Sequence, residues 1–483
     1  MRAAEWDEPA PEQSFDAEPD VHSIALLGLI GIITVGTFLL SPRVRTVQAF
    51  FRGYSDEGTP PGLLTLVFSQ VTTWIFARSL LNAGILGYYY GIAGALAYTA
   101  YYLSFLTGGW IVDGIRFRHG CGSVQEFLAR RFGSLGTTCY NAVAGVRLLS
   151  EVFANLLVIG IIFGDEGSAG YMLSIVAAAV LTLAYSLLGG LRAALRTDVF
   201  QMSVLLVAVA ILFVQAVLLD GFDWGAALAS SPDIAGPGWV LLAVALLQVW
   251  SYPLHGPVMM DRGFIADRDV TRRSFLHACW LSALCIMVFG LMGVEAGLLK
   301  QEGEDLVKTL TRLLGEPMMV LFNVALIISA VSTLDSTFAS ASKLSVIDMR
   351  LAAPTPRNGR IAMSAFLIGG LGFLFVGSKD LYAAVAVSGT ASMFLAPVVF
   401  FSIWGGREVA RWALAVAFIA ALAGAALYMV EESGYVSLIE PLTGIAHKYS
   451  KLLLIAVAVL AAGCAAFALG LKRESRVPDR PPA

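Results

Sequence analysis

The sequence predicts an all-α polytopic membrane protein with about thirteen transmembrane helices, and three observations support this prediction. Of the 483 residues, 57% are hydrophobic and 14% are charged, whereas soluble domains carry nearer ~25% charged residues. The mean hydropathy is +0.75. Apolar stretches long enough to cross ~30 Å of hydrocarbon recur along the whole chain. This composition excludes an ordinary soluble domain.

The candidate spans alternate with short polar loops. They lie near residues 21–41, 62–90, 92–113, 138–164, 171–189, 198–219, 237–256, 275–299, 316–347, 360–377, 380–403, 408–430 and 452–472. We expect one membrane domain over 21–472. Residues 1–20 are acidic and lack the basic region of a cleavable signal, so we expect them to be retained as a short extracellular tail. Residues 473–483 are expected to form a second short tail.

The distribution of basic residues tests these spans. Alternate loops carry Arg43, Arg45 and Arg52; Arg116, Arg118, Arg130 and Arg131; Arg192 and Arg196; Arg262, Arg268, Arg272 and Arg273; Arg350, Arg357 and Arg360; Arg407 and Arg411; and Lys472, Arg473 and Arg476. The intervening loops are acidic, neutral or mixed. Because basic loops stay on the cytoplasmic side, we expect a multi-pass protein of the cell (inner) membrane, with its N-terminus outside and its C-terminus in the cytoplasm.

Several function classes are disfavoured by the residue content. The 32 basic and 35 acidic residues nearly balance, which gives no reason to expect nucleic-acid binding. The five cysteines show no metal-ligand spacing. Because no nucleophile, base and orienting group occur together at one depth, we expect no enzyme.

The chain is organised around residues 322–349, an apolar segment of membrane length that is rich in hydroxyl groups. On a helix, Ser329, Ser332, Thr333 and Ser336 share one face, with Asp335 beside them. Oxygen atoms at bilayer depth are costly unless they face a partner, a cavity or an ion. The stripe suits a small hard cation such as sodium; ordinary helix packing through small polar residues is the alternative.

Two spans carry helix-breaking residues. Span two reads LVFSQVTTWIFARSLLNAG, and span seven reads LLQVWSYPLHGPVMM, with Pro253, Gly256 and Pro257. They lie five spans apart, as matching members of two five-span halves do. Interrupted helices at corresponding positions indicate a solute site near the middle of the membrane. Their freed carbonyl groups are ready ligands for a cation.

Four motifs resemble those of the sodium/solute symporter family. They are YSLLGGLRAALRTDVFQ (185–201), SAVSTLDSTFASASKLSVIDM (329–349), VQEFLARRFG (124–133) and DRGFIADRDVTRR (261–273), the last with Asp261 where glutamine is usual. The resemblance covers about residues 60–470. It implies a LeuT-type fold in which inverted five-helix repeats span about 62–219 and 237–403, with one helix before the core and two after it. It also implies that inward sodium flow drives solute uptake.

The resemblance implies two cation sites. The main sodium site falls on the carbonyl groups of Phe68, Val71 and Ser329 and on the hydroxyl groups of Ser332 and Thr333. A second cation or release site falls on Asp198, Asp335 and Ser336, next to Ser332. Asp335 stands where the family usually has serine or alanine, so this site is expected to bind sodium more strongly or to bind a proton. Pairing of Asp335 with an inner-loop arginine such as Arg196 is the alternative.

The solute is expected between the two broken spans. Candidate contacts are Gln70, Thr72, Thr73, Trp74 and Arg78 from span two, and Gln248, Trp250, Ser251, Tyr252 and His255 from span seven. Core packing is the alternative for each aromatic residue, and His255 has the alternative of capping a freed carbonyl group. Arg147 and Glu151 can pair at i,i+4, which leaves Arg78 free, or sharing Glu151. A free buried arginine is a receptor for a carboxylate.

The sequence therefore predicts a sodium-coupled symporter that imports a small polar organic solute, with a carboxylate or a zwitterion as the hypothesis for the solute. The run TTWIFARS makes a sugar the less favoured solute, because it differs from the Ser-Ala-Glu type of run in sugar-transporting relatives. Two alternatives stay open: a proton-coupled symporter of the same fold, and a solute sensor that works with a separate signalling partner. Sodium is the one expected cofactor, and the solute and membrane lipid are the expected partners. The identity of the solute, the stoichiometry and the oligomeric state stay open.

Overall fold

A computed structural model describes residues 21–219, 222–374, 381–433 and 437–472. The predicted tails at 1–20 and 473–483 lie outside the described residues. Within the described residues, helices are joined by turns and loops, and the one β-type pairing is an isolated bridge between Val409 and Leu471. The α-helices are α1 (Val21–Leu40), α2 (Val47–Arg52), α3 (Leu63–Trp74), α4 (Ala77–Ala100), α5 (Ser104–Val112), α6 (Val124–Phe132), α7 (Ser134–Phe163), α8 (Ala169–Gly189), α9 (Leu191–Phe213), α10 (Trp224–Ala229), α11 (Pro237–Gln248), α12 (Pro257–Gly263), α13 (Arg268–Leu299), α14 (Leu306–Leu314), α15 (Glu316–Lys343), α16 (Pro356–Phe373), α17 (Leu381–Ser392), α18 (Leu395–Pro397), α19 (Arg411–Glu432), α20 (Ile439–Thr443) and α21 (Lys448–Leu469). The short segments are η1 (Tyr101–Leu103), η2 (Asp113–Arg118), η3 (Val214–Leu219), η4 (Leu344–Asp348) and η5 (Val398–Trp404).

The helices confirm a multi-pass membrane protein. Within the described ranges, eight helical runs are long and apolar enough to cross a membrane, and a bent pair over 386–404 makes a ninth. Three shorter apolar helices, at Ala25–Leu40, Leu63–Trp74 and Pro237–Gln248, add to these. The predicted count of thirteen is not confirmed. The two broken spans are divided into short helices, the run Ala77–Arg118 is counted once, and α16, at the predicted span 360–377, is not among the helices long and apolar enough to cross a membrane.

The run that contains α4 is a helical hairpin. Gly91 breaks it with φ 59° and ψ −149°. A straight helix would separate Ser79 from Tyr98 by ~28 Å, yet the Tyr98 hydroxyl donates to Ser79 Oγ at 3.1 Å. A Cβ atom at Gly91 would lie 2.4 Å from Ser230 Oγ, and the positive φ also disfavours other residues. The predicted boundary between 62–90 and 92–113 therefore falls at a real reversal of the chain.

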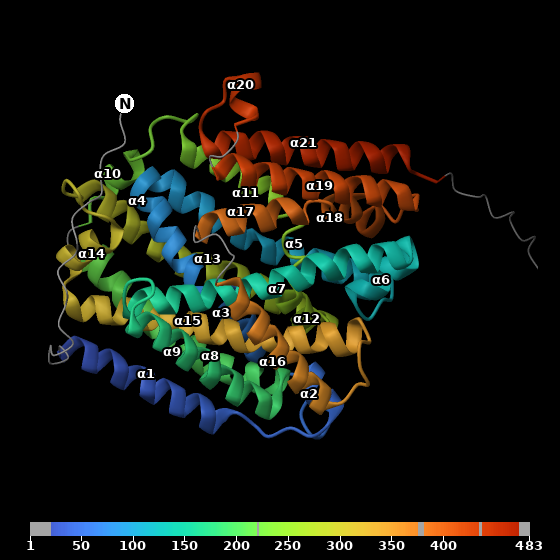
Figure 1. The fold of residues 1–483 in the computed structure, drawn as a ribbon, viewed down its shortest axis with the longest axis horizontal. Helices are drawn as coiled ribbons and strands as arrows, with labels where there is room; N and C mark the ends of the chain where they lie inside the picture. Colours follow the sequence, from blue (N-terminus) through green and yellow to red (C-terminus); the bar gives the residue numbers. More distant parts are fainter. Residues whose placement is uncertain (1–20, 220–221, 375–380, 434–436, 473–483) are drawn as a thin grey trace, which may run out of the picture.

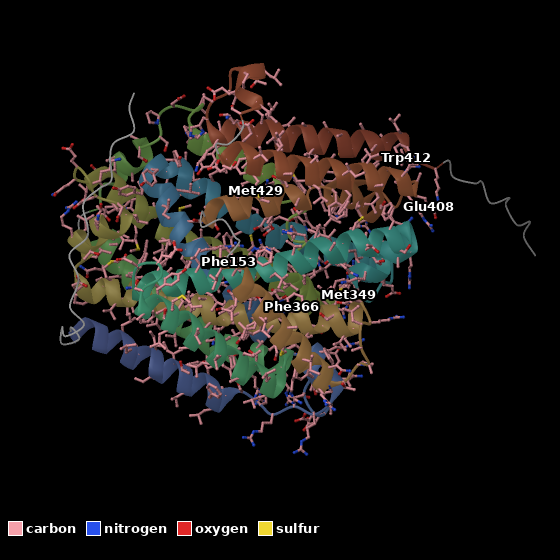
Figure 2. All side chains as sticks on the ribbon, viewed as in Figure 1. Phe153, Met349, Phe366, Glu408, Trp412 and Met429 are labelled. Atoms are coloured by element: carbon pink, nitrogen blue, oxygen red, sulfur yellow. The ribbon has the colours of Figure 1, made fainter. Side chains whose placement is uncertain are left out.

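The long helices form one bundle with peripheral helices on opposite edges. In Figure 1, α1 runs along the lower edge, and α19 and α21 run along the upper edge. The broken segments α3–α4 and α11–α12 lie between these edges, with α15 and α7 beside them (Figure 1). Side chains fill the space between the helices, and Phe153 of α7 is buried inside while Trp412 is half exposed at one end (Figure 2).

One close helix contact positions the first broken segment. A Cβ atom at Gly87 of α4 would lie 2.3 Å from the carbonyl oxygen of Gly290 in α13, and one at Gly293 would lie 2.0 Å from that of Gly84. Small residues allow such approach between membrane helices. The helix α13 is continuous over 32 residues. It therefore holds α4 in place after the chain leaves α3 at Trp74.

Candidate functional site

The first break follows α3. Helical bonding ends with the N–H of Ile75 donating to the Val71 carbonyl at 2.9 Å, and Phe76 is extended at φ −69° and ψ 153°. The last carbonyl groups of a helix have no intrahelical donor. Here side chains supply two of the missing donors. The Tyr102 hydroxyl donates to the Trp74 carbonyl at 3.2 Å, and the Ser329 hydroxyl donates to the Ile75 carbonyl. The broken backbone is thus satisfied inside the protein, as membrane depth requires.

A third side chain completes this break. The Oδ1 atom of Asn155, from α7, accepts the N–H of Ala77 at 3.3 Å. Ala77 is the first residue of α4, so Asn155 supplies a cap to the new helix. The break is therefore contacted by α7 and α15 at once.

The second break separates α11 from α12. Residues 249–255 form turns, and the N–H groups of Tyr252 and Gly256 donate to the carbonyl groups of Gln248 and Pro253. The carbonyl of Val249 accepts from Thr107 Oγ1 at 2.6 Å. His255 takes the capping alternative, because its Nδ1 lies 2.5 Å from the Tyr252 carbonyl oxygen, while its Nε2 lies 3.0 Å from Ser388 Oγ.

The two breaks meet through aromatic side chains. The rings of Trp74 and Tyr252 are 5.8 Å apart, and those of Tyr101 and Tyr252 are 5.5 Å apart. Together with Phe76, Arg78, Tyr98 and other residues, these rings line a cavity of about 10 Å³. A cavity of this size holds about one water molecule. The region between the breaks is thus nearly closed in this conformation.

Nine of the ten predicted solute contacts lie in the buried region around the two breaks. They are Gln70, Thr72, Thr73, Trp74 and Arg78 on the α3–α4 side, and Gln248, Ser251, Tyr252 and His255 on the α11–α12 side. Gln248 is bonded to Tyr101 and Thr390. In contrast, the side-chain amide of Gln70 and the hydroxyl of Thr72 are buried without a hydrogen-bond partner among the described residues.

Trp250 is the exception among the predicted contacts. Its ring packs against Trp404 and Phe400, each at 5.9 Å, and it lines a separate pocket. The turns that follow Gln248 shift the direction of successive side chains, so a helical phase does not predict where Trp250 points. The structure does not bring this residue to the cavity between the breaks.

Two buried arginines flank the ring of Phe76. Arg147 Nε pairs with Glu151 Oε1 at 2.6 Å, as the i,i+4 spacing predicts, and Thr337 donates to Glu151 Oε2 at 3.2 Å. Arg78 is 1% exposed. Its three guanidinium nitrogens have no hydrogen-bond partner within the described residues, and the group lies 5.1 Å from the Phe76 ring centroid. Of the two expected arrangements, Arg78 adopts the one without Glu151 as partner.

The hydroxyl stripe of α15 contacts the first break through Ser329. Besides the bond from Ser329 to Ile75, Thr333 Oγ1 donates to the Ser329 carbonyl at 2.8 Å, and Ser332 Oγ donates to Asp198 Oδ1 at 2.9 Å. The predicted carbonyl ligands, Phe68 and Val71, lie within α3, on the N-terminal side of the break, and not in an unwound segment. The Val71 carbonyl accepts the Ile75 N–H, and Phe68 lies earlier in the same helix. The break begins four residues after Val71.

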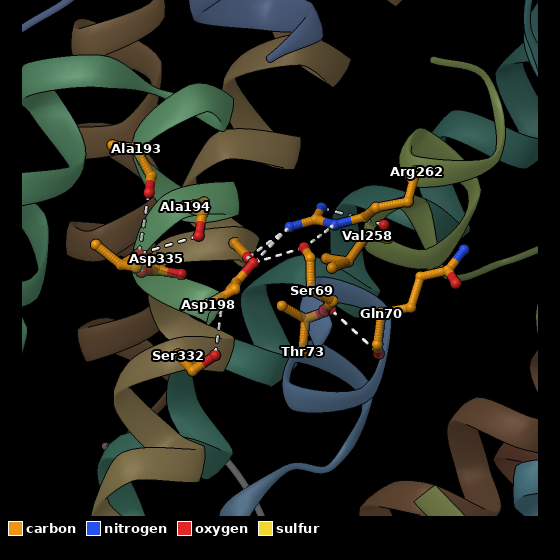
Figure 3. A network of polar contacts seen from close by, with 12 residues as sticks. Ser69, Gln70, Thr73, Ala193, Ala194, Asp198, Val258, Arg262, Ser332 and Asp335 are labelled. Carbon is orange, nitrogen blue, oxygen red and sulfur yellow. Dashed lines mark hydrogen bonds and ion pairs between the residues drawn. The ribbon is translucent and has the colours of Figure 1, made fainter. Parts of the chain in front are cut away.

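Asp198 of α9 is the centre of a buried polar network (Figure 3). Its Oδ2 accepts from Ser69 Oγ at 2.6 Å and from Ser336 Oγ at 3.5 Å, and it lies 3.6 Å from Arg262 Nη2. Ser332 occupies the other carboxylate oxygen. The predicted residues Asp198, Ser332 and Ser336 are therefore brought together, from α9 and α15.

Sequence reasoning missed two members of this network, Ser69 and Arg262. Arg262 was expected in a basic loop, but it lies in the last turn of α12 and is 0% exposed. Its Nε donates to Ser69 Oγ at 3.1 Å, its Nη2 to Ser336 Oγ at 2.6 Å, and its Nη1 to the Val258 carbonyl at 3.1 Å. A guanidinium group thus fills the volume beside Asp198. No sequence signal separates Arg262 from its loop neighbours.

Asp335 lies beside this network with different partners. Its Oδ2 accepts from the hydroxyl groups of Tyr185 and Thr197, both at 2.9 Å, while Oδ1 is buried without a hydrogen-bond partner in the described chain. Arg196, the alternative partner, is exposed. Asp261, the departure from the usual glutamine, pairs with Lys343 Nζ of α15 at 2.9 Å.

In comparisons with known proteins, this chain resembles transporters. No protein-family model matches the chain. A putative sodium-dependent multivitamin transporter of Drosophila melanogaster is 26% identical over 186 residues, which are 38% of this chain and 30% of that relative. A Na⁺-coupled sialic acid symporter, solved in a substrate-bound outward-open state, superposes with a TM-score of 0.69 at 15% identity, over 94% of this chain and 99% of that one. The chain has the LeuT-type fold of these symporters.

A second solved structure supports the same fold. A nucleobase-cation-symport-1 family transporter, in a closed conformation with bromovinylhydantoin bound, gives a TM-score of 0.56 at 17% identity, over 89% of this chain and 94% of that one. These matches are transporters rather than enzymes. The predicted LeuT-type fold is therefore confirmed.

Proposed function

We propose that this protein is a sodium-coupled symporter that imports a small polar organic solute by alternating access. The observation that carries the proposal is the contact of the Ser329 hydroxyl with the carbonyl of Ile75, which joins α15, the helix that carries the hydroxyl stripe, to the break between α3 and α4. Serine and threonine oxygens beside a helix break are the hard neutral ligands that a sodium ion needs at membrane depth. The similarity to a Na⁺-coupled symporter and a sodium-dependent transporter supports this assignment.

Sodium would bind between α3 and α15. Its ligands are the hydroxyl groups of Ser332 and Thr333, the carbonyl of Ser329, and carbonyl groups of α3, for which the sequence predicts Phe68 and Val71. Each hydroxyl now donates to an oxygen, and its lone pairs are free to accept a cation after a small rotation. Sodium at this position would tie α15 to α3, the helix that ends at the first break, and would shape the solute site.

The solute would bind between the two breaks. Because the enclosed volume is about 10 Å³, Trp74, Tyr252 and Tyr101 must separate to admit it. Gln70, Thr72 and Arg78 are among the residues with polar atoms that have no partner among the described residues. A buried arginine without a carboxylate recognises one most strongly, so we propose that the solute is a carboxylate or a zwitterion whose carboxylate binds Arg78.

Arg262 would act as a built-in cation at the second site. Its guanidinium group already bonds to Ser69 and Ser336 and lies 3.6 Å from Asp198. A sodium ion that leaves the main site past Asp198 must compete with this tethered charge. We therefore propose that Arg262 returns to Asp198 after sodium release, and that one sodium ion is transported in each cycle.

The N-terminus is proposed to lie outside and the C-terminus in the cytoplasm. Arg130, Arg268, Arg272 and Arg273 are all exposed, as basic residues at a membrane surface are expected to be. In this orientation Asp198 and Arg262 lie on the cytoplasmic side of Ser329.

Cysteine labelling tests this orientation. Asp165→Cys and Arg130→Cys are introduced one at a time into a chain whose five native cysteines are replaced by serine, and intact cells are treated with a membrane-impermeant thiol reagent. We expect Asp165→Cys to react in intact cells and Arg130→Cys to react only after the membrane is permeabilised. The reverse pattern would show the opposite orientation.

Proton coupling is the second candidate. The observation that favours it is Oδ1 of Asp335, which is buried without a partner in the described chain. Asp198 is the neighbouring carboxylate (Figure 3). Two carboxylates in one buried volume repel each other unless a cation or proton lies between them. Asp335→Asn keeps the size of the side chain and removes its charge, so it should abolish proton-driven uptake but leave sodium-dependent binding measurable.

The deciding experiment measures thermal stability of the purified protein in sodium or potassium buffer of equal ionic strength. The panel contains amino acids, carboxylates, sugars, urea, choline and nucleobases. A ligand that binds the native state raises the midpoint of thermal unfolding. At a free ligand concentration of about a hundred times Kd, it adds ~2.7 kcal/mol to the free energy of unfolding. We expect one solute to stabilise only in sodium. Stabilisation by low pH without any sodium effect would instead support proton coupling.

Matched variants separate sodium binding from folding. Thr333→Val removes a hydroxyl whose bond is to its own helix, and we expect it to abolish the sodium effect. Ser345→Ala removes a similar bond, to Ala341, away from the break, and should retain it. Sodium-driven accumulation in liposomes then distinguishes a transporter from a sensor, because a sensor binds the solute without accumulating it.

A further inference from the structure

The pocket that contains Trp250 lies outside the proposed transport path. It has a volume of about 720 Å³ and opens between α5, η2, the first turns of α13 and the end of η5. Phe105 of α5 packs on Phe275 of α13 at 6.3 Å between ring centroids, which forms the inner wall. Trp110, Trp250 and Trp404 contribute indole rings to the lining. Its size is within the range of small-molecule sites.

The mouth of this pocket is strongly basic. Arg118, Arg268, Arg272 and Arg273 line it, against Asp113 and Asp269. Asp113 is already bound by Arg268 through two bonds of 2.7 and 2.8 Å, and Asp269 lies 3.6 Å from Arg273. No ion pair of Arg118 or Arg272 is found in the described part of the chain, although Arg118 donates to the Trp404 carbonyl at 3.4 Å. Two guanidinium groups thus remain for an anion.

An apolar ridge continues from the basic mouth along the membrane face of α13. Leu276, Trp280 and Leu284 follow Arg272 at intervals of four residues, and they are 55%, 54% and 53% exposed. Residues four apart form a ridge on a helix. Trp110 on α5 is also 55% exposed. Tryptophan is enriched where a membrane helix meets the headgroups.

We propose that this pocket binds one anionic phospholipid of the membrane leaflet at the arginine-rich end of the molecule. Arg118 and Arg272 bind the phosphate group, the indole rings contact the glycerol region, and an acyl chain lies along Leu276, Trp280 and Leu284. Arginines at the mouth, indole rings in the lining and an apolar ridge on α13 supply the charged, aromatic and apolar surfaces that the phosphate, glycerol region and acyl chain of a phospholipid require. Basic pockets between membrane helices are typical sites for anionic headgroups. The inference does not depend on which solute or ion is transported.

The test measures lipid retention and stability of the full-length protein. Delipidated protein is mixed with phosphatidylglycerol or phosphatidylcholine in detergent, and bound lipid is counted by native mass spectrometry while the thermal midpoint is recorded. We expect wild type to retain one phosphatidylglycerol more than R118Q/R272Q and to be stabilised by it. The control R45Q/R357Q removes two other exposed arginines and should behave as wild type.

Three outcomes would overturn the proposal. The first is equal phosphatidylglycerol retention by wild type and R118Q/R272Q. The second is equal loss of retention in the R45Q/R357Q control, which would indicate attraction by overall charge. The third is full stabilisation by glycerol phosphate, which has the headgroup charge but no acyl chain and would identify a site for a soluble anion.

Discussion

Replacement of Arg262 by glutamine tests the proposed built-in cation most directly. The side chain is 0% exposed and makes three hydrogen bonds, to Ser69, Ser336 and Val258, besides its 3.6 Å approach to Asp198. Glutamine removes the charge and leaves Asp198 with hydroxyl partners only. Breaking one side of a buried ion pair costs about 3–5 kcal/mol. We expect Arg262→Gln to lose stability of this size in potassium buffer.

Sodium should reverse much of that loss. With Arg262 removed, a sodium ion can occupy the volume beside Asp198 and satisfy its charge. The sodium-induced rise in the thermal midpoint should therefore be larger in Arg262→Gln than in wild type, and its dependence on sodium concentration should become steeper. Titration of the purified variants from potassium into sodium buffer at constant ionic strength measures both quantities.

Two further variants make the experiment decisive. D198N/R262Q removes both charges and should be closer to wild type in potassium than Arg262→Gln is, because no unpaired buried charge remains. Arg262→Lys keeps the charge but loses the planar fork, and it should show the wild-type sodium dependence at reduced stability. The reasoning would be refuted if Arg262→Gln lost less than about 1 kcal/mol and responded to sodium as wild type does.

Three other predictions concern separate parts of the molecule. Arg78→Gln should weaken binding of a carboxylate solute by roughly 10–100-fold, since a hydrogen bond to a charged group contributes about 1.5–3 kcal/mol, and should not change sodium binding; titration of both ligands measures this. Gly91→Ala should lower the thermal midpoint, because its Cβ atom would lie 2.4 Å from Ser230 Oγ at a φ of 59°. The Arg312 guanidinium, bonded to both carboxylate oxygens, holds the pKa of Glu304 at about 2, below its ordinary 4.5, so the stabilisation from this pair is complete above pH 4.5 and is lost as the pH falls toward 2.

Each of these predictions has a result that would contradict it. Equal loss of affinity for a neutral solute would show that Arg78 does not recognise the carboxylate. An unchanged midpoint of Gly91→Ala would mean that the hairpin does not require glycine. For Glu304, Glu304→Gln should remove the acid-dependent fall of the midpoint between pH 4.5 and 2, and an identical pH profile in wild type and this variant would assign that fall to other groups.

The sequence by itself determined the features that depend on near neighbours in the chain. Hydropathy predicted a multi-pass chain of apolar helices, and the predicted boundary between 62–90 and 92–113 falls at Gly91, because burial in lipid requires long apolar stretches. Helical spacing placed Ser329, Ser332 and Thr333 on one face and paired Arg147 with Glu151. The motifs pointed to the fold that the comparisons confirm.

The tertiary structure alone decided which distant groups meet. Ser69, Asp198, Arg262 and Ser336 come from four different helices, so no spacing within one helix relates them. In the sequence, Arg262 cannot be distinguished from the other arginines of its basic loop. The packing of α12 buries it beside Asp198. The sequence also could not predict the position of the break at Ile75 or the direction of the Trp250 side chain. Both depend on which side chains of α7, α15 and η5 can contact non-helical residues and bond to their backbone N–H and carbonyl groups.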